Sequence, residues 1–137
     1  QLNAADYTKP LLQALIAARS RYGNDTVVAG DVTAPEMTYK DLFIRSFVLK
    51  RVLSSRVGGS YVGVLLPNTL AVIVTFVALH MQRRIPCMLN YSAGEASLLH
   101  ACRIAGIKTI ITSRLFMQRA KLEDIIKSLQ KEYSIVY

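Results

Sequence analysis

Gly63-Val-Leu-Leu-Pro-Asn68 is the stretch that decides the fold of this chain, together with the apolar run Leu70–Met81 that follows it. The apolar residues before the proline form a short run that is typical of a strand buried on both faces. Pro67 has no N–H to donate and disfavours helix at the preceding residue, so the strand ends there. We expect Asn68 to cap the N-terminus of a helix that Thr69 opens.

The helix expected over Thr69–Arg84 is apolar nearly all round, which is typical of a buried helix. Arg83 and Arg84 end it, where cations suit the negative end of the helix dipole. Pro86 begins the next extended segment, and we expect a strand over Ile85–Leu89. Strand, helix and strand therefore form a β-α-β unit in the middle of an α/β domain.

The rest of the chain continues this alternation. Thr38-x-x-Asp41 resembles a capping box that opens a helix over Asp41–Arg56. Before that helix, we expect a helix opened by Thr8-Lys9-Pro10 and closed at Gly23, a strand at Thr26–Ala29 and a turn-rich link at Gly30–Pro35. After it, strands are expected at Tyr61–Leu66, Lys108–Thr112 and Ser134–Tyr137. Two further helices are expected: one capped by Ser92 and Glu95 that runs to Ala105, and one capped by Ser113 that runs to about Glu132. Residues 1–137 are thus expected to form one α/β domain, a three-layer sandwich around a wound, mainly parallel sheet with right-handed crossovers.

Two of these helices have a predicted buried face. The first should bury Leu11, Leu12, Leu15, Ile16 and Ala18. The second should bury Leu42, Phe43, Phe47, Leu49, Val52 and Leu53.

Composition narrows the class of protein. The chain has 137 residues, about one domain's worth, and 52% of them are hydrophobic, which is enough for a sizeable core. The apolar stretch Val62–Met81 has the length of a membrane span, but Pro67-Asn68 interrupts it, so we expect a buried strand and helix instead.

Cys87 and Cys102 lack metal-ligand spacing and are expected to be reduced packing residues. Because the chain opens at Gln1 without a Met, we expect it to be a piece of a longer protein.

The formal net charge is +8, which has two interpretations. The basic residues are either solvated helix faces or a surface that attracts an anionic membrane or an acidic carrier protein. Nucleic acid is a weaker alternative, because nucleic-acid binders usually interleave basic residues with exposed aromatic ones. Here Tyr39, Phe43, Phe47 and Phe76 are predicted to lie on apolar faces.

Candidate chemical groups are few. Gly58-Gly59-Ser60 leads from a helix into a strand, the opposite of a phosphate-binding turn, so we interpret it as a structural turn. Asp31, Glu36 and Asp41 are placed at a turn, at its edge and at a helix cap, not in a converging pair. Asn90-Tyr91-Ser92 follows a parallel strand and is the best candidate to line a cleft. The sequence therefore predicts no catalytic, cofactor-binding or metal-binding residue.

These segments together carry a resemblance. "GVLLPN", a helix and then "RRIPCMLNYS" resemble the N-terminal part of the adenylate-forming enzymes, the acyl-CoA synthetase and AMP-binding family. Thr38-Tyr-Lys-Asp-Leu42 resembles that family's helix opening, and Ile107–Ser113 resembles its strand that ends in Thr or Ser. Ser60 departs from the family, which usually has Asp there. The spelling "RRIPCMLNYSAGE" with "IKTIITSRLFM" is most similar to the acyl–acyl-carrier-protein synthetase part of the bacterial bifunctional 2-acylglycerophosphoethanolamine acyltransferases.

The resemblance implies part of the large N-terminal subdomain of an ATP- and Mg²⁺-dependent acid–thiol ligase. Such an enzyme joins a fatty acid to the α-phosphate of ATP and passes the acyl group to acyl carrier protein or coenzyme A. The family's phosphate loop, its adenine and magnesium motif and its late lysine have no counterpart in this sequence, so the segment alone is expected to be inactive and to hold no cofactor. The resemblance further implies phospholipid re-acylation, a cytoplasmic location with peripheral association to an anionic inner membrane, and no nucleic-acid partner.

Two other interpretations stay open at the level of sequence. One is a self-contained, flavodoxin-like domain that binds a ligand or regulates at the ends of its own strands. The other is a basic adaptor that docks on a membrane or on nucleic acid.

Overall fold

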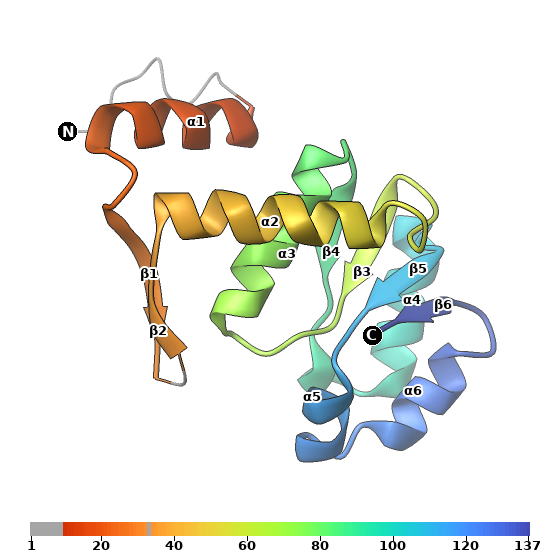
Figure 1. Ribbon diagram of the computed structural model, residues 1–137. Helices are drawn as coiled ribbons and strands as arrows, with labels where there is room; N and C mark the ends of the chain where they lie inside the picture. Colours follow the sequence, from red (N-terminus) through yellow and green to blue (C-terminus); the bar gives the residue numbers. More distant parts are fainter. Residues whose placement is uncertain (1–9, 33) are drawn as a thin grey trace.

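A parallel sheet forms the centre of the molecule (Figure 1). The computed structural model describes residues 10–32 and 34–137. The four strands of this sheet are β3 (Tyr61–Val64), β4 (Ile85–Met88), β5 (Thr109–Ile111) and β6 (Ser134–Val136), in the order β4-β3-β5-β6. Every pairing in it is parallel. The predicted α/β class and the predicted positions of these strands are confirmed.

Helices cover both faces of the sheet. On one face, α2 (Tyr39–Leu53) and α3 (Leu70–Met81) pack on Val62 and Val64. On the other face, α4 (Glu95–Ala105) and α6 (Glu123–Leu129) pack on Leu65 and Ile110, together with the short helix α5 (Arg114–Arg119). Figure 1 shows the sheet between these two groups of helices, so the predicted three-layer sandwich is confirmed.

The apolar stretch around Pro67 divides as predicted into a strand and a helix. Helix α3 is buried on more than one side: Leu79 packs on the sheet, and Val74 and Val77 pack in the Met37 cluster. Gly63 of β3 faces the side of the sheet opposite to α3, and a Cβ added there would lie 3.0 Å from Leu89 Cδ1. No helix formed by residues 10–32 and 34–137 has both the length and the apolar character needed to cross a bilayer.

The capping box of α2 is confirmed, but its predicted buried face is partly wrong. Thr38 Oγ1 accepts the Asp41 N–H at 3.2 Å, and the Asp41 carboxylate accepts the Thr38 N–H at 3.2 Å. The buried residues of α2 are Leu42, Ser46 and Leu53. Phe47 and Val52 are about half exposed, because they point away from the side of α2 that packs on α3 and, through Leu53, on the sheet.

The N-terminal part differs from the prediction in two respects. Of the segment predicted as a link at Gly30–Pro35, residues 30–31 belong instead to β1 (Val27–Asp31) and residues 34–35 to β2 (Ala34–Thr38), and the two strands pair antiparallel. Helix α1 (Leu11–Tyr22) has no buried residue, although Leu12 and Leu15 are half-buried against the Met37 cluster. The predicted start at Thr8-Lys9 lies outside the described residues. At the other end, Gly23 follows α1 as predicted, with a positive φ of 95° and its N–H bonded to Arg19 O.

The single helix predicted from Ser113 to Glu132 is two helices. Ser113 does cap α5, and its Oγ accepts the Phe116 N–H at 3.4 Å. The chain then turns at Lys121, which has a left-handed φ of 54°, and α6 begins two residues later. The turn directs Leu122 into the core beneath α4, where 6% of it is exposed. Burial of this leucine therefore outweighs the continuation of the helix.

Candidate binding crevice at the carboxyl ends of β3 and β5

The strand order places a topological switch point between β3 and β5. These strands are hydrogen-bonded neighbours, yet the chain leaves β3 toward α3 on one face and leaves β5 toward α5 and α6 on the opposite face. In open α/β sheets, ligands bind in the crevice that this divergence opens beyond the carboxyl ends of the strands.

The described residues do form a crevice at this point, with a volume of about 890 Å³. This is within the range of small-molecule pockets. Most of its surface is apolar, and its lining residues are Asp31, Ala34, Arg45, Leu49, Leu66, Pro67, Thr69, Leu70, Ala71, Val74, Tyr91, Ser113, Leu115, Phe116, Arg119 and Ala120.

The wall that follows β3 is fixed by hydrogen bonds to β5 and to the hairpin. Leu65 N donates to Ile111 O at 2.9 Å, and Thr112 Oγ1 donates to Leu65 O at 2.8 Å. Beyond Pro67, the N–H of Leu70 donates to Asp31 Oδ2 at 2.9 Å. A carboxylate from β1 thus satisfies the first amide of α3 and suits the positive end of its dipole.

The predicted cap at Asn68 is therefore wrong. Asn68 is exposed. The N-cap residue of α3 is Thr69, and its side chain accepts no helix N–H. The reason is that Asp31, 39 residues earlier in the chain, already occupies the acceptor position at Leu70.

The opposite wall comes from the segment after β4 and from α5. Tyr91 packs edge-to-face on Phe116, with ring centroids 5.1 Å apart and an interplanar angle of 79°. Of the predicted cleft residues, Tyr91 lines the crevice, whereas Asn90 and Ser92 bond to each other, with Asn90 Oδ1 accepting the Ser92 N–H at 3.0 Å. The predicted capping box of Ser92 is wrong, because a short 3-10 turn at 91–93 precedes Gly94, and α4 begins at Glu95.

Two arginines lie at the crevice, Arg45 from α2 and Arg119 from the end of α5, and both are exposed. The one acidic lining residue is Asp31, which is bound to Leu70 N. An apolar lining with guanidinium groups at its edge suits a ligand that has an apolar body and an anionic group. Sequence reasoning missed both arginines, since nothing in their local sequence indicates a site.

The remaining predicted groups lie elsewhere. Gly58-Gly59-Ser60 precedes β3, at the opposite edge of the sheet, and Gly58 N donates to Thr109 Oγ1 at 3.0 Å. Glu36 is exposed on β2, and Asp41 serves the α2 cap. Hydrogen bonds from the Thr38 backbone and side chain lower the pKa of Asp41.

The described residues contain no cluster of metal-ligating side chains. Among residues 10–32 and 34–137, no group of three or more His, Cys, Asp or Glu side chains could hold a metal ion. Cys87 and Cys102 are free thiols. Burial raises the pKa of Cys102 to about 11, with a smaller contribution from the nearby Cys87. These thiols are therefore protonated at neutral pH and poor nucleophiles.

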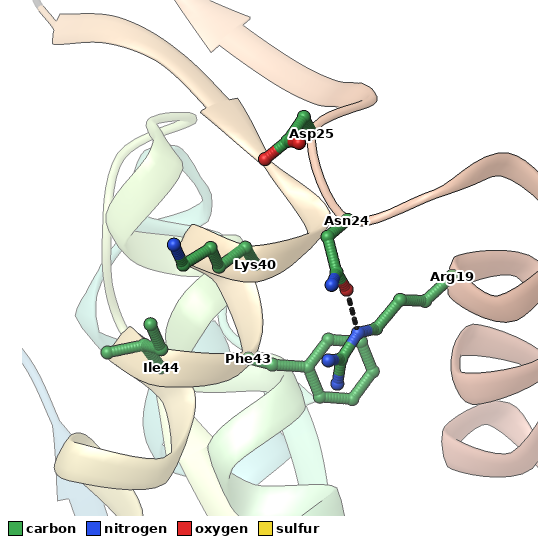
Figure 2. A pocket seen from close by; sticks show the side chains of 6 residues that line it. All are labelled: Arg19, Asn24, Asp25, Lys40, Phe43 and Ile44. Atoms are coloured by element: carbon green, nitrogen blue, oxygen red, sulfur yellow. Dashed lines mark hydrogen bonds between the residues drawn. The ribbon is translucent and has the colours of Figure 1, made fainter.

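A second hollow, of about 350 Å³, lies between the end of α1 and the start of α2 (Figure 2). The Arg19 guanidinium lies over the Phe43 ring, 5.3 Å from its centroid, and its Nε donates to Asn24 Oδ1. Asp25, Lys40 and Ile44 complete the rim. Since Arg19 already has partners within the chain, this hollow joins α1 to α2 and offers no comparable binding site.

Comparison with known proteins identifies the family. Residues 16–137 match the AMP-binding enzyme family, and the chain belongs to it.

Solved structures show the same fold at low identity. The VinN complex with 3-methylaspartate matches with a TM-score of 0.75 and 16% identity, over 92% of this chain and 34% of that one. The N-terminal subdomain of NpsA from Klebsiella oxytoca, in complex with 3-hydroxyanthranilyl-AMSN, matches with a TM-score of 0.71 and 14% identity, over 94% and 29%. Fatty acyl CoA synthetase from Mycobacterium tuberculosis matches with a TM-score of 0.60 and 17% identity, over 72% and 19%. The chain thus spans between about a fifth and a third of these proteins.

Proposed function

We propose that this chain is the N-terminal portion of an ATP-dependent acyl-activating ligase. The observation that carries the proposal is the family match over residues 16–137. In the reaction we propose for the parent enzyme, a substrate carboxylate attacks the α-phosphorus of ATP and pyrophosphate leaves. A thiol then attacks the acyl carbon and AMP leaves, which produces a thioester.

Within that enzyme, the segment acts as a scaffold. We propose that no residue of this segment holds ATP or Mg²⁺. In support, residues 10–32 and 34–137 contain no group of three or more His, Cys, Asp or Glu side chains that could hold a metal ion, and Gly58 of the glycine turn bonds to Thr109. We therefore assign no step of the reaction to residues of this chain. In the proposal, the nucleotide-binding groups belong to other parts of the parent enzyme.

A fatty acid is the proposed acyl substrate, and acyl carrier protein or coenzyme A is the proposed acceptor. The apolar lining of the crevice is compatible with an alkyl chain nearby, and the net charge of +8 favours approach of an acidic carrier protein. One structural relative is an artificially fused adenylation–PCP di-domain protein from Klebsiella oxytoca, and it matches over 20% of its length. We further propose that the parent enzyme serves phospholipid re-acylation in the cytoplasm, where its basic surface allows peripheral contact with the anionic inner membrane.

The parent protein provides the test. It should release pyrophosphate from ATP and Mg²⁺ only when a fatty acid is present, and mass spectrometry should detect acylated carrier protein or acyl-coenzyme A. Omission of the fatty acid is the control. Pyrophosphate release that is independent of every fatty acid tested would contradict the proposal.

A self-contained ligand-binding or regulatory domain is the second candidate, because the crevice is formed by this chain alone. The two candidates differ in what the 137-residue chain does by itself. As part of a ligase, it should neither bind ATP·Mg²⁺ with micromolar affinity nor release pyrophosphate. Calorimetry with ATP and Mg²⁺ checks this, and micromolar binding would favour the self-contained domain.

A further inference from the structure

Helix α2 exposes an apolar stripe on the side that faces away from the sheet. Ile44, Val48 and Val52 follow one another at intervals of four residues and therefore lie on one face of the helix, with Phe47 beside them. Their exposed fractions are 54%, 56%, 48% and 51%, respectively. The opposite side of α2 is buried through Leu42, Ser46 and Leu53.

The helix is thus apolar on two opposite sides. Leu49, which lies on the buried side, and the neighbouring Arg45 line the crevice. A surface helix normally has one apolar stripe and a polar opposite face, whereas a helix that is apolar on several sides is typical of a buried layer. A contiguous exposed apolar stripe of this kind is a candidate interaction surface.

Basic residues accompany the stripe, and they limit what can cover it. Lys40, Arg45, Arg51 and Arg56 are exposed on α2 and on the turn that follows it. The ammonium group of Lys50 lies over the Phe47 ring, 5.6 Å from its centroid. In a symmetric pair of two copies, these cations would face one another, which is unfavourable. The charges therefore favour a covering surface that is apolar with carboxylates around it.

We propose that the outer face of α2 is an intramolecular interface in the parent protein. The surface that covers it belongs to the rest of the AMP-binding domain and carries carboxylates that pair with the basic residues of α2. This inference rests on the proposed function. It is supported by the size of the NpsA subdomain, of which this chain matches 29%, so the equivalent unit there is a minority of one subdomain.

Cysteine accessibility tests the proposal, on a background in which Cys87 and Cys102 are replaced by alanine. Val48→Cys reports on the stripe. The matched control is Ile104→Cys, because Ile104 is 74% exposed and lies on α4, on the other face of the sheet. In the 137-residue chain, a maleimide should label both variants at similar rates. In the parent protein, we expect labelling at position 48 to be at least a hundredfold slower, with labelling at position 104 unchanged.

The acidic surroundings are tested by Arg51→Glu in the same variants. In the parent protein this change should raise the labelling rate at Val48→Cys at least tenfold, and in the 137-residue chain it should leave the rate unchanged. An unchanged rate in the parent would overturn the assignment of carboxylates to the covering surface.

Three other results would overturn the interface itself. The first is rapid labelling at position 48 in a parent protein that still activates fatty acids, a result that leaves the proposed function intact. The second is protection at position 48 in a 137-residue chain that sediments as a dimer, which would identify a second copy as the occupant. The third is protection that requires vesicles with about 30% phosphatidylglycerol, which would identify a membrane. Protection in a parent protein that lacks fatty-acid activation would instead contradict the proposed function alone.

Discussion

Replacement of Asp31 by alanine should destabilise the protein more than replacement of Asn68, although Asn68 adjoins the start of α3. The carboxylate of Asp31 accepts the Leu70 N–H at 2.9 Å, so it acts as a remote cap of that helix. Loss of an N-cap acceptor costs about 0.5–2 kcal/mol, and loss of a negative charge at a helix N-terminus costs about 0.3–1 kcal/mol. We therefore expect Asp31→Ala to lower the free energy of unfolding by about 1–2 kcal/mol. Asp31→Asn keeps an acceptor and should lose about half as much.

Urea unfolding followed by circular dichroism measures this difference. With a slope of about 1–3 kcal/mol per molar urea, a loss of about 1.5 kcal/mol moves the midpoint by about 0.5–1.5 M. Asn68→Ala is the matched control, and because that side chain caps nothing, its effect should stay within about 0.5 kcal/mol. Hydrogen exchange at the Leu70 amide should accelerate in Asp31→Ala alone. A larger loss for Asn68→Ala than for Asp31→Ala would refute the assignment of the cap.

Three further predictions concern the core, the α2 cap and the thiols. Leu79→Ala truncates a side chain with 0% exposure and should lower the free energy of unfolding, measured in urea, by about 2–5 kcal/mol. Leu115→Ala, at a position that is 56% exposed, should lower it by less than about 0.5 kcal/mol. Equal effects would contradict the packing of α3. The pKa of Asp41 is lowered in the fold from its ordinary value of 3.8, so its contribution to stability is present above that pH and is lost as the pH falls through the folded pKa. The stability advantage of the wild type over Asp41→Asn should therefore disappear at acid pH, and unfolding curves between pH 2.5 and pH 7 measure it. At pH 8, a disulfide reagent should modify half-buried Cys87 well before Cys102, which is fully buried and has a pKa of about 11; mass spectrometry after proteolysis distinguishes the two thiols.

Local signals in the sequence were sufficient for the central layers of the fold. Pro67 ends a strand because it lacks an N–H, whatever surrounds it. Thr38 and Asp41 form the capping box within a span of four residues, so the pattern and the structure depend on the same bonds. The apolar runs at 62–66 and 70–81 indicate burial on more than one side, which a parallel sheet with helices on both faces provides.

Features that depend on distant residues were not predictable in the same way. The cap of α3 comes from Asp31, and no local pattern near Leu70 points to it. The sequence at Lys121 favours continued helix, but the burial of Leu122 beneath α4 breaks the helix there. Likewise, the periodicity of α2 marks several apolar positions and cannot show which of them the neighbouring elements cover.

The crevice shows the same limit, since it unites segments that are far apart in the chain. Its lining runs from Asp31 in the hairpin through Arg45 in α2 and Tyr91 after β4 to Arg119 at the end of α5. Sequence reasoning placed Tyr91 correctly because it follows a parallel strand, a position with general meaning in α/β sheets. The arginines gain their place only from the packing of helices, which the local sequence does not specify.

Helix α2 connects the crevice with the exposed stripe, and this connection determines how ligand binding to the chain should be interpreted. The helix contributes Leu49 to the crevice and Val48 to the stripe, so adjacent residues serve the two surfaces. A parent domain that covers the stripe would also lie beside the crevice and change its walls. An apolar probe that binds the 137-residue chain can therefore be occupying surface that other residues of the parent protein cover. Only a ligand that binds both the chain and the parent protein, and whose binding depends on Arg45 or Arg119 in both, occupies the crevice as a functional site.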